Sequence, residues 1–159
     1  MPFATASSAL ALVLLLAPLA SARADEAPKA TAPPPPASTE DPLVANHAGM
    51  KFVPVTTPGI PPGAESALVG VDPATKGGTA YVRFAPGMTV PMHSHSFAEY
   101  SVVLSGKALF TVDGKKHALS SGSYVVIPAK VNHELTCEKD SHCLLLTRRA
   151  GPADYTFVK

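Results

Sequence analysis

The feature that most constrains the fold is a series of short apolar runs broken by turn-forming residues. Runs rich in β-branched and aromatic residues, such as TAYVRF, YSVVL, ALFTV and YVVI, alternate with the stretches DPATKGG, APG, VDGKK and SSGS. No long segment of this region shows a helical period. Short strands with regular turn signals are typical of antiparallel sandwiches and barrels. The pattern predicts the all-β class and a small antiparallel β-barrel.

The first 24 residues have the composition of a secretory signal peptide. The apolar run ALALVLLLAPL is too short to span a bilayer, and small residues with an A-x-A pattern follow it. We expect cleavage after Ala24 and export to the periplasm or the extracellular space. A buried N-terminal helix or an uncleaved anchor is the alternative interpretation.

Residues 25–42 are predicted to form a Pro/Ala-rich flexible tether, because this stretch holds six prolines and almost no large apolar residue. Residues 43–159 then form one domain. The formal net charge of +1 indicates neither a nucleic-acid partner nor a polybasic membrane surface. No membrane span is expected after processing. Arg148 and Arg149 are interpreted as solvated charges at a strand end.

The stretch GMTVPMHSHSFAEYSVVLSG carries the candidate site. On a strand, His93 and His95 point to the same face, whereas on a helix they would diverge by about 200°. On a straight strand Glu99 would lie about 20 Å from His93. We therefore expect the chain to bend between His95 and Glu99 and to return the carboxylate to the imidazoles. Gly87 and Gly106, which bracket the stretch, are predicted turn residues.

This spacing resembles the first motif of the cupin family: Gly87, five residues, His93, one residue, His95, three residues, Glu99, six residues, Gly106. A second motif follows as Gly122-SYVVI-Pro128-AKVN-His133. Lys130 stands where that motif usually has glycine. The resemblance covers nearly all of residues 43–159 and implies a double-stranded β-helix, the jelly-roll cupin fold. The chain is similar in particular to single-domain, quercetin-dioxygenase-like cupins.

By this resemblance, His93, His95, Glu99 and His133 are expected to ligate one divalent transition metal. Three imidazoles and a carboxylate suit Mn, Fe, Ni, Cu or Zn and leave coordination positions open. Glu99 is also the candidate catalytic residue, as a proton acceptor. The resemblance further implies a small-molecule ligand or substrate and a homodimer.

Strand alternation predicts which side chains line the pocket. The predicted lining is mostly apolar and consists of Ser101, Val103, Ala108, Phe110, Val112, Leu135 and Leu145. Alternation places no further carboxylate or histidine beside the metal, and it leaves Tyr81, Tyr100 and Tyr124 as the uncommitted hydroxyls. This shortage disfavours side-chain acid–base chemistry.

Cys137 and Cys143 are predicted to form a disulfide, because an exported chain with an even number of cysteines favours a bridge. Residues 133–138 and 142–148 are expected to form an antiparallel hairpin. In that hairpin Cys137 would face Cys143, Leu135 would face Leu145, and His133 would face Thr147. Two free buried thiols are the alternative.

Three functions remain open at this point. The chain could be a metal-dependent dioxygenase that acts on a small phenolic or enol-like molecule. It could equally be a non-catalytic module that binds a metal or a small molecule. An isomerase is less favoured, because it needs a positioned base besides the ligands.

Overall fold

The computed structural model of the chain describes residues 43–159. The predicted signal peptide and tether therefore lie outside the described residues. The described part is nearly all β, with one short 3₁₀ turn, η1 (His47–Gly49). The strands are β1 (Val53–Pro54), β2 (Ala64–Val71), β3 (Gly78–Phe84), β4 (Thr89–Ser94), β5 (Glu99–Ser105), β6 (Lys107–Val112), β7 (Lys115–Ser120), β8 (Tyr124–Ile127), β9 (His133–Cys137), β10 (Cys143–Arg149) and β11 (Thr156–Phe157).

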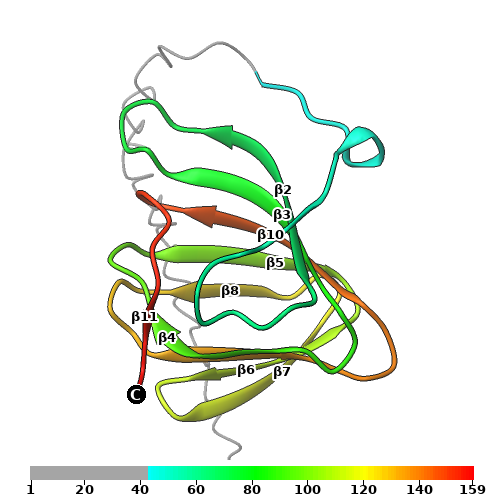
Figure 1. The fold of residues 1–159 in the computed structure, drawn as a ribbon, viewed down its shortest axis with the longest axis vertical. Coiled ribbons are helices and arrows are strands. Elements are labelled where there is room, and N and C mark those ends of the chain that lie inside the picture. The colour runs from blue at the N-terminus through cyan, green and yellow to red at the C-terminus, as the bar shows by residue number, and fades with distance from the viewer. Residues whose placement is uncertain (1–42) are drawn as a thin grey trace, which may run out of the picture. The chain divides into compact units, whose positions relative to one another are not determined.

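The strands form two antiparallel sheets. The six-stranded sheet has the order β1-β2-β3-β10-β5-β8, and the five-stranded sheet has the order β11-β4-β9-β6-β7 (Figure 1). The predicted all-β class is confirmed, and the strands make two separate hydrogen-bonded sheets instead of one closed barrel. Within residues 43–159, no helix is long and apolar enough to cross a membrane.

Alternation along the strands builds the core. Every second residue of β9, β10 and the first part of β5 is buried, as a half-buried strand requires. The largest fully buried side chains include Phe110, Ile127, Leu145 and Val103. Polar residues occupy some of these inward positions, among them Glu99 and His133. The site is therefore built into the inner faces of the sheets.

Two turns between strands depend on left-handed backbone conformations. Gly106, between β5 and β6, has a φ of 78°, and a Cβ there would lie 2.3 Å from the carbonyl oxygen of His142. Lys130 has a φ of 65°, so the turn keeps the conformation that glycine normally supplies, although a side chain is present. The backbone N–H of Lys130 donates to the carbonyl of His95 at 2.8 Å. The Lys130 turn thus holds the segment that carries His95.

The predicted hairpin between the two cysteine-bearing strands is wrong. Strand β9 pairs with β4 and β6, whereas β10 pairs with β3 and β5 in the other sheet. Leu135 therefore faces Val90 and Phe110, not Leu145, and His133 does not face Thr147. Both edges of β10 are already occupied by neighbouring strands, so β9 cannot pair with it.

Cys137 and Cys143 are nevertheless joined by a disulfide, with their Cα atoms 5.7 Å apart. The bond connects the end of β9 to the start of β10. Since these strands belong to different sheets, the disulfide links the two sheets at the end of the sandwich where the chain crosses over.

Candidate metal centre

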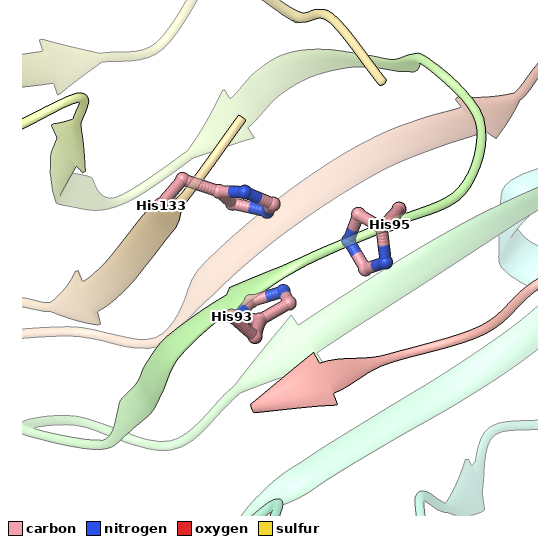
Figure 2. Close-up of side chains that lie close together, drawn as sticks. All are labelled: His93, His95 and His133. Atoms are coloured by element: carbon pink, nitrogen blue, oxygen red, sulfur yellow. The ribbon is translucent and has the colours of Figure 1, made fainter. Parts of the chain in front are cut away.

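Three buried histidines meet at the inner face of the five-stranded sheet. His93 on β4 and His133 on β9 are directly paired across the two strands, and His95 follows the end of β4 by one residue. One nitrogen from each imidazole lies within 4.8 Å of the other two. Figure 2 shows the three rings converging from two neighbouring segments of the chain. The exposed fractions are only 3%, 4% and 2% for His93, His95 and His133.

Backbone carbonyls orient all three rings. The Nδ1 atoms of His93, His95 and His133 meet the carbonyl oxygens of Pro91, Asp154 and Val131, at 2.7, 2.5 and 3.1 Å respectively. Because a carbonyl only accepts, we assign the proton to Nδ1 in His93 and His133, which leaves their Nε2 atoms with a free lone pair. His95 Nδ1 lies between an acceptor, Asp154 O, and a donor, Arg149 Nη1 at 2.6 Å, so its partners do not assign its tautomer.

The Nε2 atom of His95 is buried and has no hydrogen-bond partner. Its separation of 3.2 Å from Glu99 Oε2 is short, but the contact does not have hydrogen-bond geometry. A buried nitrogen without a hydrogen-bond partner is costly unless a ligand uses it. The three imidazoles therefore fit a metal ion, and carbonyl partners fix the tautomers of His93 and His133 as in known histidine sites.

The imidazoles of His93 and His133 are held in the neutral form that binds metals. Burial, together with the neighbouring His133, lowers the pKa of His93 to about 4. Burial likewise lowers the pKa of His133. Both rings are therefore neutral at neutral pH, and neutral imidazole is the ligand form.

The predicted bend between His95 and Glu99 is confirmed, because β4 ends before it and β5 begins after it in the other sheet. The Glu99 carboxylate is surrounded by donors. Its Oε2 lies 2.8 Å from Arg149 Nη2, and its Oε1 accepts from the Ser101 hydroxyl at 3.1 Å. Ser101 in turn shares a hydrogen bond of 2.9 Å with Thr147.

These contacts decide the charge of Glu99. Burial alone would raise its pKa, but the His95 imidazole and the Arg149 guanidinium lower it to about 2. Glu99 is therefore an ionised carboxylate. The group of nitrogen atoms that could hold a metal consists of His93, His95 and His133 and does not include Glu99. The assignment of Glu99 as a fourth ligand remains a prediction.

Arg149 was expected to be a solvated charge, and that expectation is wrong. Its exposed fraction is 9%, and it faces Glu99 directly across the β10–β5 ladder. Arg149 Nη1 donates to Asp154 O at 3.4 Å and lies 2.6 Å from His95 Nδ1, and Nη2 donates to the Tyr155 hydroxyl at 3.2 Å. Alternation along β10 could have revealed this position, because Arg149 has the same parity as the buried residues Leu145 and Thr147.

The C-terminal strap, residues 154–157, also belongs to the site and was not predicted. Its strand β11 pairs with β4 opposite His93. The ring of Tyr155 lies 4.8 Å from that of His95 and 5.2 Å from that of His93, measured between centroids. Phe157 stacks on Tyr155. Of the hydroxyls considered from sequence, Tyr124 is exposed and Tyr81 packs on His47 instead.

A cavity of about 60 Å³ adjoins the histidines. Its walls come from Val55, Ile60, Ala64, Val82, Phe84, Val90, His93, Glu99, Phe110, His133, Leu135, Leu145, Thr147, Arg149 and Tyr155. Phe110, Leu135 and Leu145, which alternation suggested as lining residues, are among these walls. The other suggested residues are not among them: Ser101, Val103 and Ala108 are buried, and Val112 packs against the core.

Comparison with known proteins gives a consistent picture of the fold. Residues 80–147 match the family described as "Cupin domain". No curated protein matches the chain.

Solved structures with the same fold include an RmlC-like cupin from Shewanella frigidimarina, at 20% identity over 69% of this chain and 89% of the other, with a TM-score of 0.56. A predicted oxalate decarboxylase from Thermotoga maritima matches at 18% identity over 67% and 97%, with a TM-score of 0.60. The polyketide cyclase RemF from Streptomyces resistomycificus matches at 17% over 73% and 84%, with a TM-score of 0.62. At these identities the likeness concerns the fold alone.

Proposed function

Because residues 80–147 match the cupin domain, we propose that the chain is an exported metal-binding cupin in which His93, His95 and His133 hold one divalent transition metal. The observation that carries the proposal is the arrangement of the three buried imidazoles. The Nδ1 atoms of His93 and His133 each donate to a carbonyl, which leaves their Nε2 lone pairs for an ion, and the buried Nε2 of His95 has no hydrogen-bond partner. Such a set suits Mn, Fe, Ni, Cu or Zn.

Other residues of the chain would orient the three metal-binding imidazoles and would border the open coordination positions of the metal. Three protein ligands leave coordination positions for a small molecule. Arg149 and Ser101 hold Glu99 beside the ligand His95. Glu99 therefore acts either as a fourth ligand or as a fixed negative charge next to the ion.

As the specific activity we propose a metal-dependent dioxygenase that acts on a small phenolic or enol-like molecule, adding both atoms of O₂ to it. A redox-active metal would supply the oxygen chemistry when bound. The low pKa of Glu99 supports metal-centred chemistry over proton transfer, since a carboxylate with a pKa of about 2 is a weak base at neutral pH. The same observation disfavours an isomerase.

Non-catalytic binding of a metal or a small molecule is the second candidate, and it uses the same residues. Metal analysis of protein purified from its native compartment, combined with O₂-uptake assays on phenols and diketones, separates the two. Iron, manganese, nickel or copper with O₂ uptake supports the dioxygenase. Zinc without turnover supports the binding module.

Export and assembly are separate parts of the proposal. The disulfide Cys137–Cys143 is consistent with an oxidising compartment. N-terminal sequencing of the mature protein should begin near Asp25, and an intact Met1 would contradict export. Light scattering of the purified protein tests the expected homodimer.

A further inference from the structure

The C-terminal strap holds one of the three histidines from a distant part of the chain. We infer that the strap is a positioning element for His95, and that metal binding and docking of the strap stabilise each other. The strap lies beyond residues 80–147, which match the cupin domain. This inference rests on the proposed metal site and adds to it a segment that couples metal occupancy to the state of the C-terminus.

The three imidazoles are held in two different ways. The Nδ1 atoms of His93 and His133 each donate to a carbonyl two residues earlier in the chain. These two histidines also face each other across the paired strands β4 and β9. His95 lies beyond the end of β4, and the carbonyl 2.5 Å from its Nδ1 belongs to Asp154, 59 residues away. Of the three, His95 alone takes its carbonyl partner from the strap.

Asp154 and Tyr155 surround the His95 segment. The Asp154 carbonyl lies beside the imidazole, and the Asp154 carboxylate accepts from the backbone N–H of Ser96 at 3.0 Å. The ring of Tyr155 packs edge-on against the same imidazole, with 4.8 Å between centroids. Arg149 Nη1 lies 2.6 Å from His95 Nδ1, and Arg149 Nη2 donates to the Tyr155 hydroxyl at 3.2 Å. Displacement of the strap would therefore remove a polar and an aromatic neighbour of the His95 ring.

Within the described part of the chain, the strap has few contacts besides these. Strand β11 pairs with β4 through two residues, and so short a pairing is weak by itself. Val158 N–H donates to Met92 O at 3.0 Å, and the Phe157 ring packs against Gly59. The contacts with the His95 segment are therefore a substantial part of what holds the strap in place.

Metal binding at His95 favours the docked strap for a chemical reason. An ion held at Nε2 requires the ring proton on Nδ1, and that proton needs an acceptor. The docked strap supplies the Asp154 carbonyl at this position. A released strap leaves the proton to solvent and the ring free to rotate. The ion therefore binds the docked state more tightly, and by linkage metal binding favours docking by the same factor.

Amide hydrogen exchange of the unmodified protein, measured by mass spectrometry with and without zinc, tests the coupling without any substitution. We expect zinc to slow exchange by about tenfold or more in a C-terminal peptide that covers residues 155–159. A peptide that covers β7 is the control, because β7 is an edge strand without a proposed ligand. Its exchange should change much less.

Substitutions in the strap test the reverse direction. Asp154→Ala removes the carboxylate that ties the strap to the backbone after His95, and Tyr155→Ala removes the ring beside the imidazole. Calorimetry at a temperature where each variant is folded should show zinc binding weakened by about tenfold. A merely structural role would lower stability without changing the affinity of the folded protein. Tyr155→Phe, which keeps the ring, should lose less affinity than Tyr155→Ala.

Asp140→Ala is the matched control for Asp154→Ala. Asp140 is an exposed aspartate whose ion pair with Lys107 lies at the surface, so its loss should leave zinc affinity unchanged. If a strap variant does not fold, the exchange measurement on the unmodified protein decides alone.

The outcomes separate the strap from the metal site. Absence of stoichiometric zinc binding to the unmodified protein would refute the proposed metal site itself. Zinc binding that does not slow exchange in the strap would overturn the coupling while leaving the metal site intact. The same holds if folded Asp154→Ala and Tyr155→Ala bind zinc as tightly as the unmodified protein.

Discussion

Glu99 and Arg149 face each other across β5 and β10, and Arg149 Nη2 lies 2.8 Å from Glu99 Oε2. Both side chains are nearly buried, so each is the main charge partner of the other. A buried pair of this kind is itself no proof of net stabilisation, but removing one partner leaves an uncompensated charge. The ion pair therefore contributes both to the stability of the six-stranded sheet and to the charge at the histidine end of the cavity.

Arg149→Met should destabilise the protein by about 3–5 kcal/mol, because it leaves the Glu99 carboxylate buried without its cation. Urea unfolding measures the change. The neighbouring Arg148→Met is the matched control: Arg148 is half exposed and lies 3.7 Å from Asp72 at the surface, so its loss should cost less than about 1 kcal/mol. Equal effects of the two substitutions would show that the buried pair has no special role.

Lys130→Gly should stabilise the protein, by about 1 kcal/mol. Lys130 has a φ of 65°, a conformation that costs a residue with a Cβ about 1–2 kcal/mol, and the greater freedom of glycine in the unfolded chain offsets part of the gain. Thermal unfolding tests this. Lys116→Gly in the exposed strand β7 should instead destabilise, since glycine weakens a strand interior. A loss of stability for Lys130→Gly would contradict the account of this turn.

Loss of the disulfide should weaken metal binding as well as stability. The chain-entropy model assigns about 2 kcal/mol to so short a loop. Cys137 lies on the same strand as His133, and the bond fixes that strand against the other sheet. We expect the Cys137→Ser/Cys143→Ser double variant to melt at a lower temperature and to bind metal more weakly at temperatures where it remains folded. Unchanged metal affinity in the folded variant would refute the positioning role.

Stability of the metal-free protein should fall as the pH is lowered from about 6.5 towards 4. The folded-state pKa of His93 is about 4 against 6.5 for the free residue, so the unfolded chain binds more protons throughout this window. His133 contributes with the same sign. Glu99 has a folded-state pKa of about 2 against 4.5, so its own contribution is lost only below about pH 4.5.

Urea unfolding at pH 7.5 and pH 5 in the presence of a chelator measures the effect. His93→Gln should reduce the pH dependence of the free energy of unfolding. His117→Gln, at an exposed position of β7, should leave that pH dependence unchanged. A metal-free protein that is equally stable at both pH values would contradict the buried, neutral state of the imidazoles.

Local patterns predicted much of the fold and site because those features depend on strand parity. The shared face of His93 and His95 and the inward set Ala108 and Phe110 follow from a period of two. The bend before Glu99 follows from the rise per residue of a straight strand. The wrong prediction of a hairpin between β9 and β10 has another origin. Long-range pairing decides which strands flank β10, and the residues near the two cysteines do not encode that pairing.

The missed residues show a second limit. Arg149 resembles an ordinary charge at a strand end, and only the ladder to β5 reveals that it faces Glu99. Tyr155 lies just before a strand of two residues, too short to give a pattern. Its place beside His93 and His95 depends on the pairing of β11 with β4.

Calorimetric titration with zinc, combined with elemental analysis after dialysis, tests directly whether His93, His95 and His133 hold one divalent metal ion. The titration is run on the unmodified protein, on His95→Ala, on His133→Ala and on the control His117→Ala. We predict one tightly bound ion per chain in the unmodified protein and in His117→Ala, and severe loss of the ion in the other two variants. Unchanged stoichiometry and affinity in both His95→Ala and His133→Ala would contradict the account.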